Sequence, residues 1–275
     1  MNLSVFFDHV LQAKEQTGKT VEELLEGVRN AGIEAVEINL SYLCEHEEVL
    51  GLLSQNDLKV SCIYEFYDMG NRDETEKARK HVDTAVSVGA KRILVVPGFL
   101  SGEASKQMQK AMPVQENIVG FFENNSEIKR MAEGLSFATK YGKEKGVVVT
   151  VEDFDGLDSP LAGMYGIHWF LQQVPELMYT LDTGNFLFYG EDVLDAFELL
   201  KERIAHVHCK DRQPENNASV QTGTGYIPFA EIINKLKVQQ YDGFLAIEHF
   251  DVDGQEECMH GSAEFLGTVK KLKVY

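Results

Sequence analysis

Residues 147–152 read Val-Val-Val-Thr-Val-Glu and follow a glycine, Gly146. A nearly continuous apolar run of this length is typical of a parallel strand that is covered on both faces. A glycine just before such a run is typical of the residue that ends a helix and leads into a strand. Apolar side chains repeat at helical spacing over residues 128–141, so the whole stretch predicts a helix followed by a buried strand.

The same alternation of helix-like and strand-like segments continues along the chain. A capping box formed by Thr20 and Glu23 predicts the start of one helix, Gly32 predicts the end of that helix, and Gly89 predicts the end of another. Segments rich in β-branched and aromatic residues predict eight strands, at residues 3–7, 35–40, 59–66, 92–97, 147–154, 177–182, 204–210 and 243–250.

Eight strands in 275 residues give about 34 residues per strand–helix unit, close to the size of a (β/α)8 TIM barrel. An open doubly wound sheet is the alternative. Its glycine-rich turn is missing after the first strand, where the sequence reads Phe7-Asp8-His9-Val10. No linker or low-complexity tract interrupts the chain. We therefore predict an α/β protein with a single TIM-barrel domain over residues 1–275.

Composition and charge exclude some classes of function. The formal net charge is −18, which repels phosphate backbones and argues against a nucleic-acid partner. No apolar run approaches the roughly 20 residues of a membrane span, so we predict no membrane association. The four cysteines are scattered without a Cys-x-x-Cys pair, as in a reducing compartment. These features together predict a cytoplasmic protein.

Four successive predicted strands each end in a polar residue that follows an apolar run by the same few positions: Glu152, Asp182, His208 and Glu248. In a barrel, such residues meet at the carboxyl-terminal rim. Three carboxylates held close together repel one another unless a positive charge lies between them. A divalent cation supplies that charge, with His208 completing the set. This mixture favours Mn²⁺ or Mg²⁺, and Co²⁺ or Zn²⁺ are also compatible with it.

The residues beside these four receive less specific interpretations. Asp153, Asp211 and His249 should alternate away from the barrel interior, so we interpret them as helix caps or solvated rim residues. His206 faces the same way as His208, and a core or supporting role is favoured over ligation. The connections at residues 98–124 and 211–228 are long and are predicted to border the pocket entrance. The first carries little periodicity until its end, and the second contains Gly-Thr-Gly.

In these motifs the sequence resembles the xylose-isomerase-like barrel superfamily, which includes sugar phosphate isomerases/epimerases, ketose 3-epimerases, hydroxypyruvate isomerases and inosose dehydratases. The matching motifs are Glu152, Asp182-Thr-Gly-Asn185, His206-Val-His208-Cys-Lys210-Asp211, Gly223-x-Gly225-x-Ile227-x-Phe229 and Ala-Ile-Glu248. The resemblance implies a small carbohydrate substrate, and dimers and tetramers are common in similar proteins, so a homo-oligomer is compatible with it.

Carried over residue by residue, the resemblance implies that Glu152, Asp182, His208 and Glu248 are the metal ligands. It also implies that Glu152 and Glu248 act as an acid/base pair. The family often has histidine at the position of Asn185, where it contacts substrate, and this departure weakens the match to ketose 3-epimerases.

Further candidate substrate contacts lie near the same rim. Lys210 and Arg212 fall near a basic position that contacts substrate in the family. His9, at the end of the first predicted strand, and Glu65, near the end of the third, are rim residues and candidate contacts by position alone.

The residues themselves also indicate proton-transfer chemistry, independently of the resemblance. Removing a proton next to a carbonyl requires a base near the carbon and an electrophile on the oxygen where an enediolate develops. Glu152 and Glu248, on either side of a cation, could reach the carbon from opposite faces. Moving the proton from one face of the carbon to the other gives epimerisation, and returning it to the neighbouring carbon gives isomerisation. Loss of the β-hydroxyl instead gives dehydration. We predict a metal-dependent sugar or sugar phosphate isomerase or epimerase of carbohydrate metabolism, with an inosose-type dehydratase as the alternative.

Three other classes of function are alternatives for a barrel of this kind. A Schiff-base aldolase would use Lys210, but the ring of acids is unnecessary for imine chemistry. A metal-dependent endonuclease would place more histidines at the strand ends and conflicts with the charge of −18. A non-catalytic barrel that has kept its metal site and binds a ligand is the third.

Overall fold

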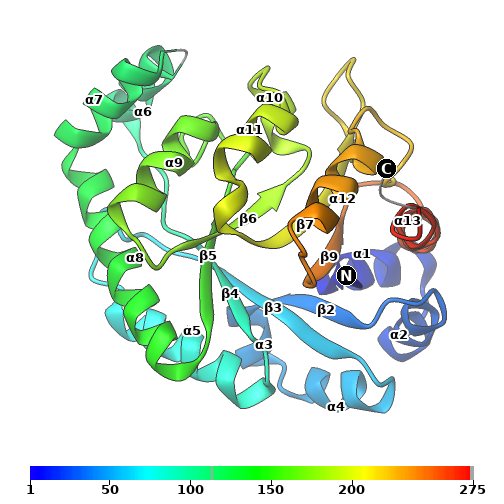
Figure 1. Ribbon diagram of the computed structural model, residues 1–275. Coiled ribbons are helices and arrows are strands. Elements are labelled where there is room, and N and C mark those ends of the chain that lie inside the picture. The colour runs from blue at the N-terminus through cyan, green and yellow to red at the C-terminus, as the bar shows by residue number, and fades with distance from the viewer. Residues whose placement is uncertain (113, 273–275) are drawn as a thin grey trace. The chain divides into compact units, whose positions relative to one another are not determined.

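The computed structural model describes residues 1–112 and 114–272. These residues form two compact units, which are described separately. The first unit combines Met1–Cys62 with His206–Tyr275, and the second is Ile63–Ala205. Strands and helices alternate along the chain in both units (Figure 1). All eight predicted strands are present, with ends that differ from the prediction by at most two residues.

The strands of the first unit pair in parallel in the order β2-β1-β9-β7. They are buried, as their continuous apolar sequences predict. A short strand that was not predicted, β8, pairs antiparallel with the end of β7. The bounds are β1 (Asn2–Phe6), β2 (Ala35–Asn39), β7 (Ile204–Arg212), β8 (Ser219–Val220) and β9 (Phe244–Glu248), and β3 (Lys59–Phe66) begins in this unit.

Helices of the first unit follow these strands. Thr20 caps α2 through the predicted capping box with Glu23, and the apolar face of α2 is buried. Helix α1 packs beside both α2 and α13 (Figure 1). The bounds are α1 (Phe7–Thr17), α2 (Val21–Asn30), α3 (Leu40–Glu45), α4 (Glu48–Gln55), α12 (Phe229–Val238) and α13 (Gln255–Val269).

The second unit contains parallel strands in the order β3-β4-β5-β6. Their bounds are β4 (Arg92–Val96), β5 (Val148–Glu152) and β6 (Met178–Asp182). Two buried threonines show how the polar groups between these strands are satisfied. The Thr180 hydroxyl donates to the Thr150 hydroxyl at 2.8 Å, which donates in turn to the Ile93 carbonyl at 3.0 Å.

Helices α5 and α8 of the second unit pack against each other (Figure 1). They end at Gly89 and Gly146, whose φ angles of 77° and 75° confirm the predicted helix-ending glycines. The bounds are α5 (Thr75–Val88), α6 (Gly102–Ala111), α7 (Gln115–Asn124), α8 (Ser126–Lys145), α9 (Met164–Gln173), α10 (Asn185–Phe188), α11 (Val193–Leu200) and the 3₁₀ helix η1 (Lys201–Arg203).

The connection after β4 differs from the prediction. We expected little regular structure over residues 98–124, but α6 and α7 occupy most of it. Helix α6 is built from strong helix formers such as Glu, Ala, Lys, Gln and Met, and buries only Ser105 and Met108. A helix with so narrow an apolar face gives a weak periodic signal, which explains why the pattern missed it.

Candidate functional site

The carboxyl ends of β7 and β9 bring three predicted site residues of the first unit together. His208 lies opposite Ala246, and Lys210 lies opposite Glu248, in the parallel register of these strands. His208 Nδ1 is 3.0 Å from Glu248 Oε2, and Lys210 Nζ is 2.6 Å from Glu248 Oε1. All three side chains are buried. These three side chains therefore form one buried cluster within this unit.

The charge on Glu248 follows from these contacts. Burial alone would raise the pKa of this carboxyl, but Lys210 and His208 outweigh it and hold the pKa well below its usual range. Glu248 is therefore an ionised carboxylate in a buried place. An ionised oxygen beside an imidazole nitrogen is a donor pair that divalent cations bind.

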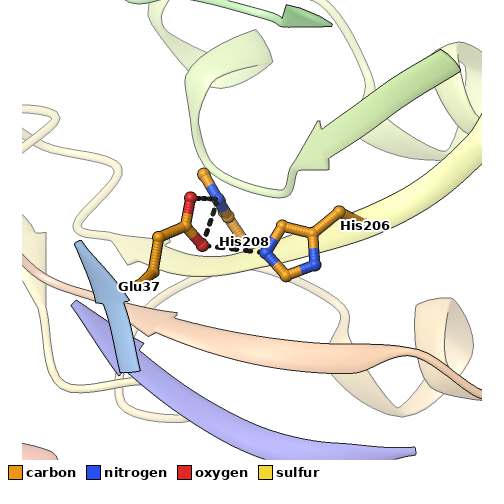
Figure 2. A group of neighbouring side chains, drawn as sticks. All are labelled: Glu37, His206 and His208. Atoms are coloured by element: carbon orange, nitrogen blue, oxygen red, sulfur yellow. Dashed lines mark hydrogen bonds and ion pairs between the residues drawn. The ribbon is translucent and has the colours of Figure 1, made fainter. Parts of the chain in front are cut away.

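Glu37 is a member of this cluster that the sequence analysis missed. It lies in the middle of β2 with no exposed surface. Figure 2 shows its carboxylate beside the His208 ring, with dashed lines to a nitrogen of His208 and to a nitrogen of His206. Oε2 is 2.8 Å from His206 Nε2, and both oxygens are 3.2 Å from His208 Nε2. These three side chains form a buried acid–histidine group with the spacing of metal ligands.

The ionisation of Glu37 is also set by its neighbours. Burial opposes its charge, yet His208 and His206 overcome this effect and lower the pKa of the carboxyl to about 2. A charged residue inside a buried strand was visible in the sequence as Ala35-Val-Glu-Ile-Asn39. Barrel chemistry usually lies at strand ends, and Glu37 lies in a strand interior, so the strand-end pattern does not identify it.

The ends of β5 and β6 hold the predicted acids of the second unit. Glu152 lies opposite Thr180, two residues before Asp182, and both acids are buried. Asp182 Oδ1 accepts hydrogen bonds from the backbone N–H groups of Gly184 and Asn185, at 2.7 and 2.8 Å. These bonds hold the Asp182 carboxylate at the turn that follows its strand.

Asp153 differs from its interpretation as a solvated rim or capping residue. It is 1% exposed, and its Oδ1 accepts hydrogen bonds from the Tyr179 hydroxyl at 2.5 Å and from Asp182 N at 2.9 Å. Burial, followed by the charge of Asp182, raises the pKa of Asp153 well above its usual range. The residue ties the end of β5 to the end of β6, between the two predicted ligands.

The candidate substrate contacts occupy varied surroundings. Asn185 is buried, and its amide donates to the Asp153 carbonyl at 2.7 Å. Arg212 is also buried, and its Nη1 donates to the Asn217 carbonyl at 2.6 Å. Glu65 accepts from Phe66 N at 2.8 Å and lies 3.4 Å from Lys77 Nζ. Their proposed contacts with substrate stay predictions.

His9 is not at an open rim position as its place in the sequence suggested. It lies in the first turn of α1 with no exposed surface, and its Nε2 accepts a hydrogen bond from His249 N at 3.0 Å. The His9 and His249 rings stack with centroids 4.6 Å apart. Burial and then the neighbouring His249 lower the pKa of His9 well below its usual range, so this ring is neutral. His249 is fully buried too, in contrast to its interpretation as a helix cap or solvated rim residue.

Asp211 organises the connection after β7. Its Oδ2 accepts hydrogen bonds from Gly223 N at 2.8 Å and Gly225 N at 2.9 Å, and its Oδ1 accepts one from Ile227 N at 3.1 Å. This buried role replaces its interpretation as a solvated residue. Gly223 has φ 94°, and a Cβ there would collide with the Phe265 ring, so both backbone conformation and space require glycine.

The sequence was then compared with known proteins. Residues 25–268 match the family described as xylose isomerase-like TIM barrel, and the chain belongs to this family. The match confirms the predicted (β/α)8 fold class. In the described part of the chain, no helix is both long and apolar enough to cross a membrane.

Several relatives have curated names. An inosose dehydratase of Clostridium perfringens is 26% identical over 262 residues, covering 83% of this chain and 82% of that protein. Inosose dehydratase 1 of Bacillus cereus is 25% identical over 253 residues, covering 84% of this chain and 82% of that protein.

Solved structures share the fold at lower identity. A probable 3-DHS dehydratase of Bacillus anthracis gives a TM-score of 0.74 at 15% identity, covering 97% of this chain and 99% of that one. D-Psicose 3-epimerase of Clostridium cellulolyticum gives a TM-score of 0.73 at 14% identity, covering 99% of this chain and all of that one. These likenesses are of fold alone.

Proposed function

We propose that this chain is a single-domain barrel over residues 1–275 in which four side chains bind one divalent cation: Glu152, Asp182, His208 and Glu248. Mn²⁺ or Mg²⁺ is favoured, and Co²⁺ or Zn²⁺ is also compatible. The observation that carries this proposal is the His208–Glu248 pair, in which a buried, ionised carboxylate lies 3.0 Å from an imidazole nitrogen. The matched positions of Glu152 and Asp182 at the ends of β5 and β6 support it. Three oxygen donors and one nitrogen donor suit a hard or borderline cation.

We propose further that the protein is an enzyme acting on a polyhydroxy ketone, either a sugar, a sugar phosphate or a cyclitol. The bound cation would stabilise negative charge as it develops on the carbonyl oxygen. Glu152 and Glu248 hold or move the proton on the carbon next to that carbonyl. Lys210, whose Nζ is 2.6 Å from Glu248 Oε1, orients this carboxylate. Transfer of the proton through an enediolate gives isomerisation or epimerisation.

Dehydration is the second candidate, and a specific observation favours it. The curated relatives are named inosose dehydratases, and their similarity covers more than four-fifths of the chain. Both candidates begin with removal of the same proton and differ in whether the neighbouring hydroxyl then leaves. Asn185 also weakens the match to ketose 3-epimerases, because the family often has histidine at this position. A small carbohydrate ligand, a cytoplasmic location and a homo-oligomer belong to the same proposal.

The test is a metal analysis of the purified protein followed by a substrate panel in D₂O. Ketoses, sugar phosphates and inososes are each incubated with protein loaded with Mn²⁺ or Mg²⁺, and products are read by NMR and mass spectrometry. Deuterium on the substrate carbon without loss of water indicates an isomerase or epimerase. Loss of water indicates a dehydratase. A metal-loaded protein that neither turns over nor exchanges any of these compounds would support the non-catalytic barrel instead.

A further inference from the structure

We infer that Glu37 is a positioning residue, which holds His208 in the ring orientation and tautomer that direct the Nδ1 lone pair toward the proposed cation. The inference rests on the proposed function, because it assigns Glu37 a role at that same site. Glu37 lies in the middle of β2, on the Nε2 side of the proposed ligand His208.

The contacts on the two ring nitrogens of His208 carry the argument. Nε2 lies 3.2 Å from both oxygens of Glu37, and Nδ1 lies 3.0 Å from Glu248 on the opposite side of the ring (Figure 2 shows the Glu37 side). An ionised carboxylate only accepts hydrogen bonds, so the hydrogen assigned to Nε2 is donated to Glu37. When the proposed cation is bound, the neutral ring would then have its one lone pair on Nδ1, on the side of Glu248, and both groups would serve as ligands.

Two further side chains hold Glu37 and His208 in these positions. His206, two residues earlier on β7, places Nε2 2.8 Å from Glu37 Oε2 and fixes the carboxylate from a second direction. The Phe6 ring packs edge-on against His208, with centroids 4.9 Å apart and planes at 75°. Because Glu37, His206 and His208 have no exposed surface, water does not compete for these hydrogen bonds. Hydrogen bonds of this kind orient metal-ligating histidines and are worth about 10–100-fold in metal affinity.

The same three residues have the spacing of a metal site, so a second ion between them is the competing explanation. That ion would take the Nε2 lone pair of His208 while the proposed cation takes Nδ1. A neutral imidazole cannot offer both lone pairs, because one nitrogen carries hydrogen. Hydrogen bonding to Glu37 requires no such loss of a proton from the ring, and we therefore favour the positioning role.

The experiment compares Glu37→Gln with the wild type and with Ser61→Ala. Ser61 is a matched control, since it is buried and the hydrogen of its hydroxyl is donated to the backbone of β2, at the Val36 carbonyl and 3.0 Å away. Mn²⁺ affinity is measured by calorimetry and by electron paramagnetic resonance. We expect affinity to fall about 10–100-fold in Glu37→Gln and to stay within about twofold of wild type in Ser61→Ala.

A second readout does not depend on activity. Long-range ¹H–¹⁵N spectra of the Mg²⁺-loaded protein report which nitrogen of His208 carries hydrogen, with the signal assigned by its loss in His208→Gln. We expect Nε2–H in the wild type and a mixture of protonation patterns in Glu37→Gln. If Glu37→Gln does not fold, His206→Phe, which removes the second donor to Glu37, should still weaken Mn²⁺ binding several-fold.

The outcomes separate the two proposals. Wild-type protein that binds no Mn²⁺ contradicts the proposed function. Wild-type protein that binds one Mn²⁺, with unchanged affinity and unchanged His208 spectra in the variants, overturns the role of Glu37 alone. Two Mn²⁺ ions in the wild type and one in Glu37→Gln would also overturn it, in favour of a second metal site.

Discussion

The hydroxyl of Tyr179 donates a 2.5 Å hydrogen bond to the carboxylate of Asp153, so a strand-interior tyrosine holds the acid that adjoins Glu152. Both residues are almost completely buried. The same Asp153 oxygen accepts a hydrogen bond from Asp182 N. One contact thus links the end of β5, where Glu152 lies, to the end of β6, where Asp182 lies.

We expect Tyr179→Phe to lower the free energy of unfolding by about 1–3 kcal/mol, because it leaves a buried carboxylate oxygen with one donor fewer. Urea denaturation monitored by circular dichroism measures the effect. Tyr226→Phe is the control, since Tyr226 is 67% exposed and should change stability little. Equal stability of Tyr179→Phe and the wild type would show that the bond contributes nothing net.

Buried His81 should make the protein less stable in mild acid. Its Nε2 donates to the Ile63 carbonyl at 3.1 Å, and its Nδ1 accepts from the Tyr67 hydroxyl at 3.0 Å. Burial lowers the pKa of His81 to about 4 in the folded state. The unfolded chain therefore binds more protons than the folded one between about pH 6.5 and 4, and stability falls as the pH drops through this window.

From this difference in pKa we expect His81 to remove about 2 kcal/mol of stability between pH 7.5 and pH 5. Urea denaturation across this range measures the loss in the wild type and in His81→Gln, which keeps a donor for Ile63 but does not titrate. Asn124→Gln, at the end of α7, is the control and should keep the wild-type dependence, because neither side chain titrates. A His81→Gln protein with the same pH dependence as the wild type would contradict the assignment.

Substitution of Gly223 tests whether the backbone conformation and the limited space at this position stabilise the connection after β7. We expect Gly223→Ala to destabilise the protein by about 1–3 kcal/mol, because alanine is strained at φ 94° and its Cβ meets the Phe265 ring. Gly18→Ala is matched to it, since Gly18 has φ 73° but open space around it, and so measures backbone strain alone. Thermal and urea unfolding of the two variants compare the effects. A Gly18→Ala variant that loses as much stability would show that the contact with Phe265 adds nothing.

The proposed acid/base roles are tested by Glu152→Gln and Glu248→Gln. Each keeps a neutral oxygen for the cation but removes the base, so we expect moderately weaker metal binding and about a 10²–10⁴-fold loss of turnover. With two bases, one variant should still exchange the substrate α-proton with solvent deuterium while forming no product. NMR of deuterium wash-in and metal analysis are the measurements, with the surface variant Glu22→Gln as control. Turnover at the wild-type rate in either variant would remove the acid–base role from that residue.

The strands and their polar ends were predictable because both depend on local sequence. Runs such as Val-Val-Val-Thr-Val identify a buried strand, and the next residue must lie at its end. Glu37 was not predictable in this way, because its partners His206 and His208 are about 170 residues away in the sequence. Only the register of β2, β1, β9 and β7 brings them together.

The acids next to the strand ends were misread for a related reason. Simple alternation turned Asp153 and Asp211 outward, toward solvent. In the structure, each carboxylate turns toward backbone N–H groups of a following segment, at Asp182 for the first and at Gly223, Gly225 and Ile227 for the second. Such bonds depend on the path of a later loop, which strand periodicity does not encode.

Asp211 also bears on how this protein could acquire new specificity. Its carboxylate fixes the path of residues 223–227 through their main-chain N–H groups, and so places no demand on the side chains of Thr224 and Tyr226. Tyr226 is largely exposed on this segment. Substitution of Tyr226 can change the exposed side chain of this segment, while the hydrogen bonds to Asp211 at the end of β7 keep its backbone in place. Directed evolution could therefore diversify Tyr226, provided that Asp211, the two glycines and Thr224, whose hydroxyl donates to the Gln221 carbonyl at 2.8 Å, are left untouched.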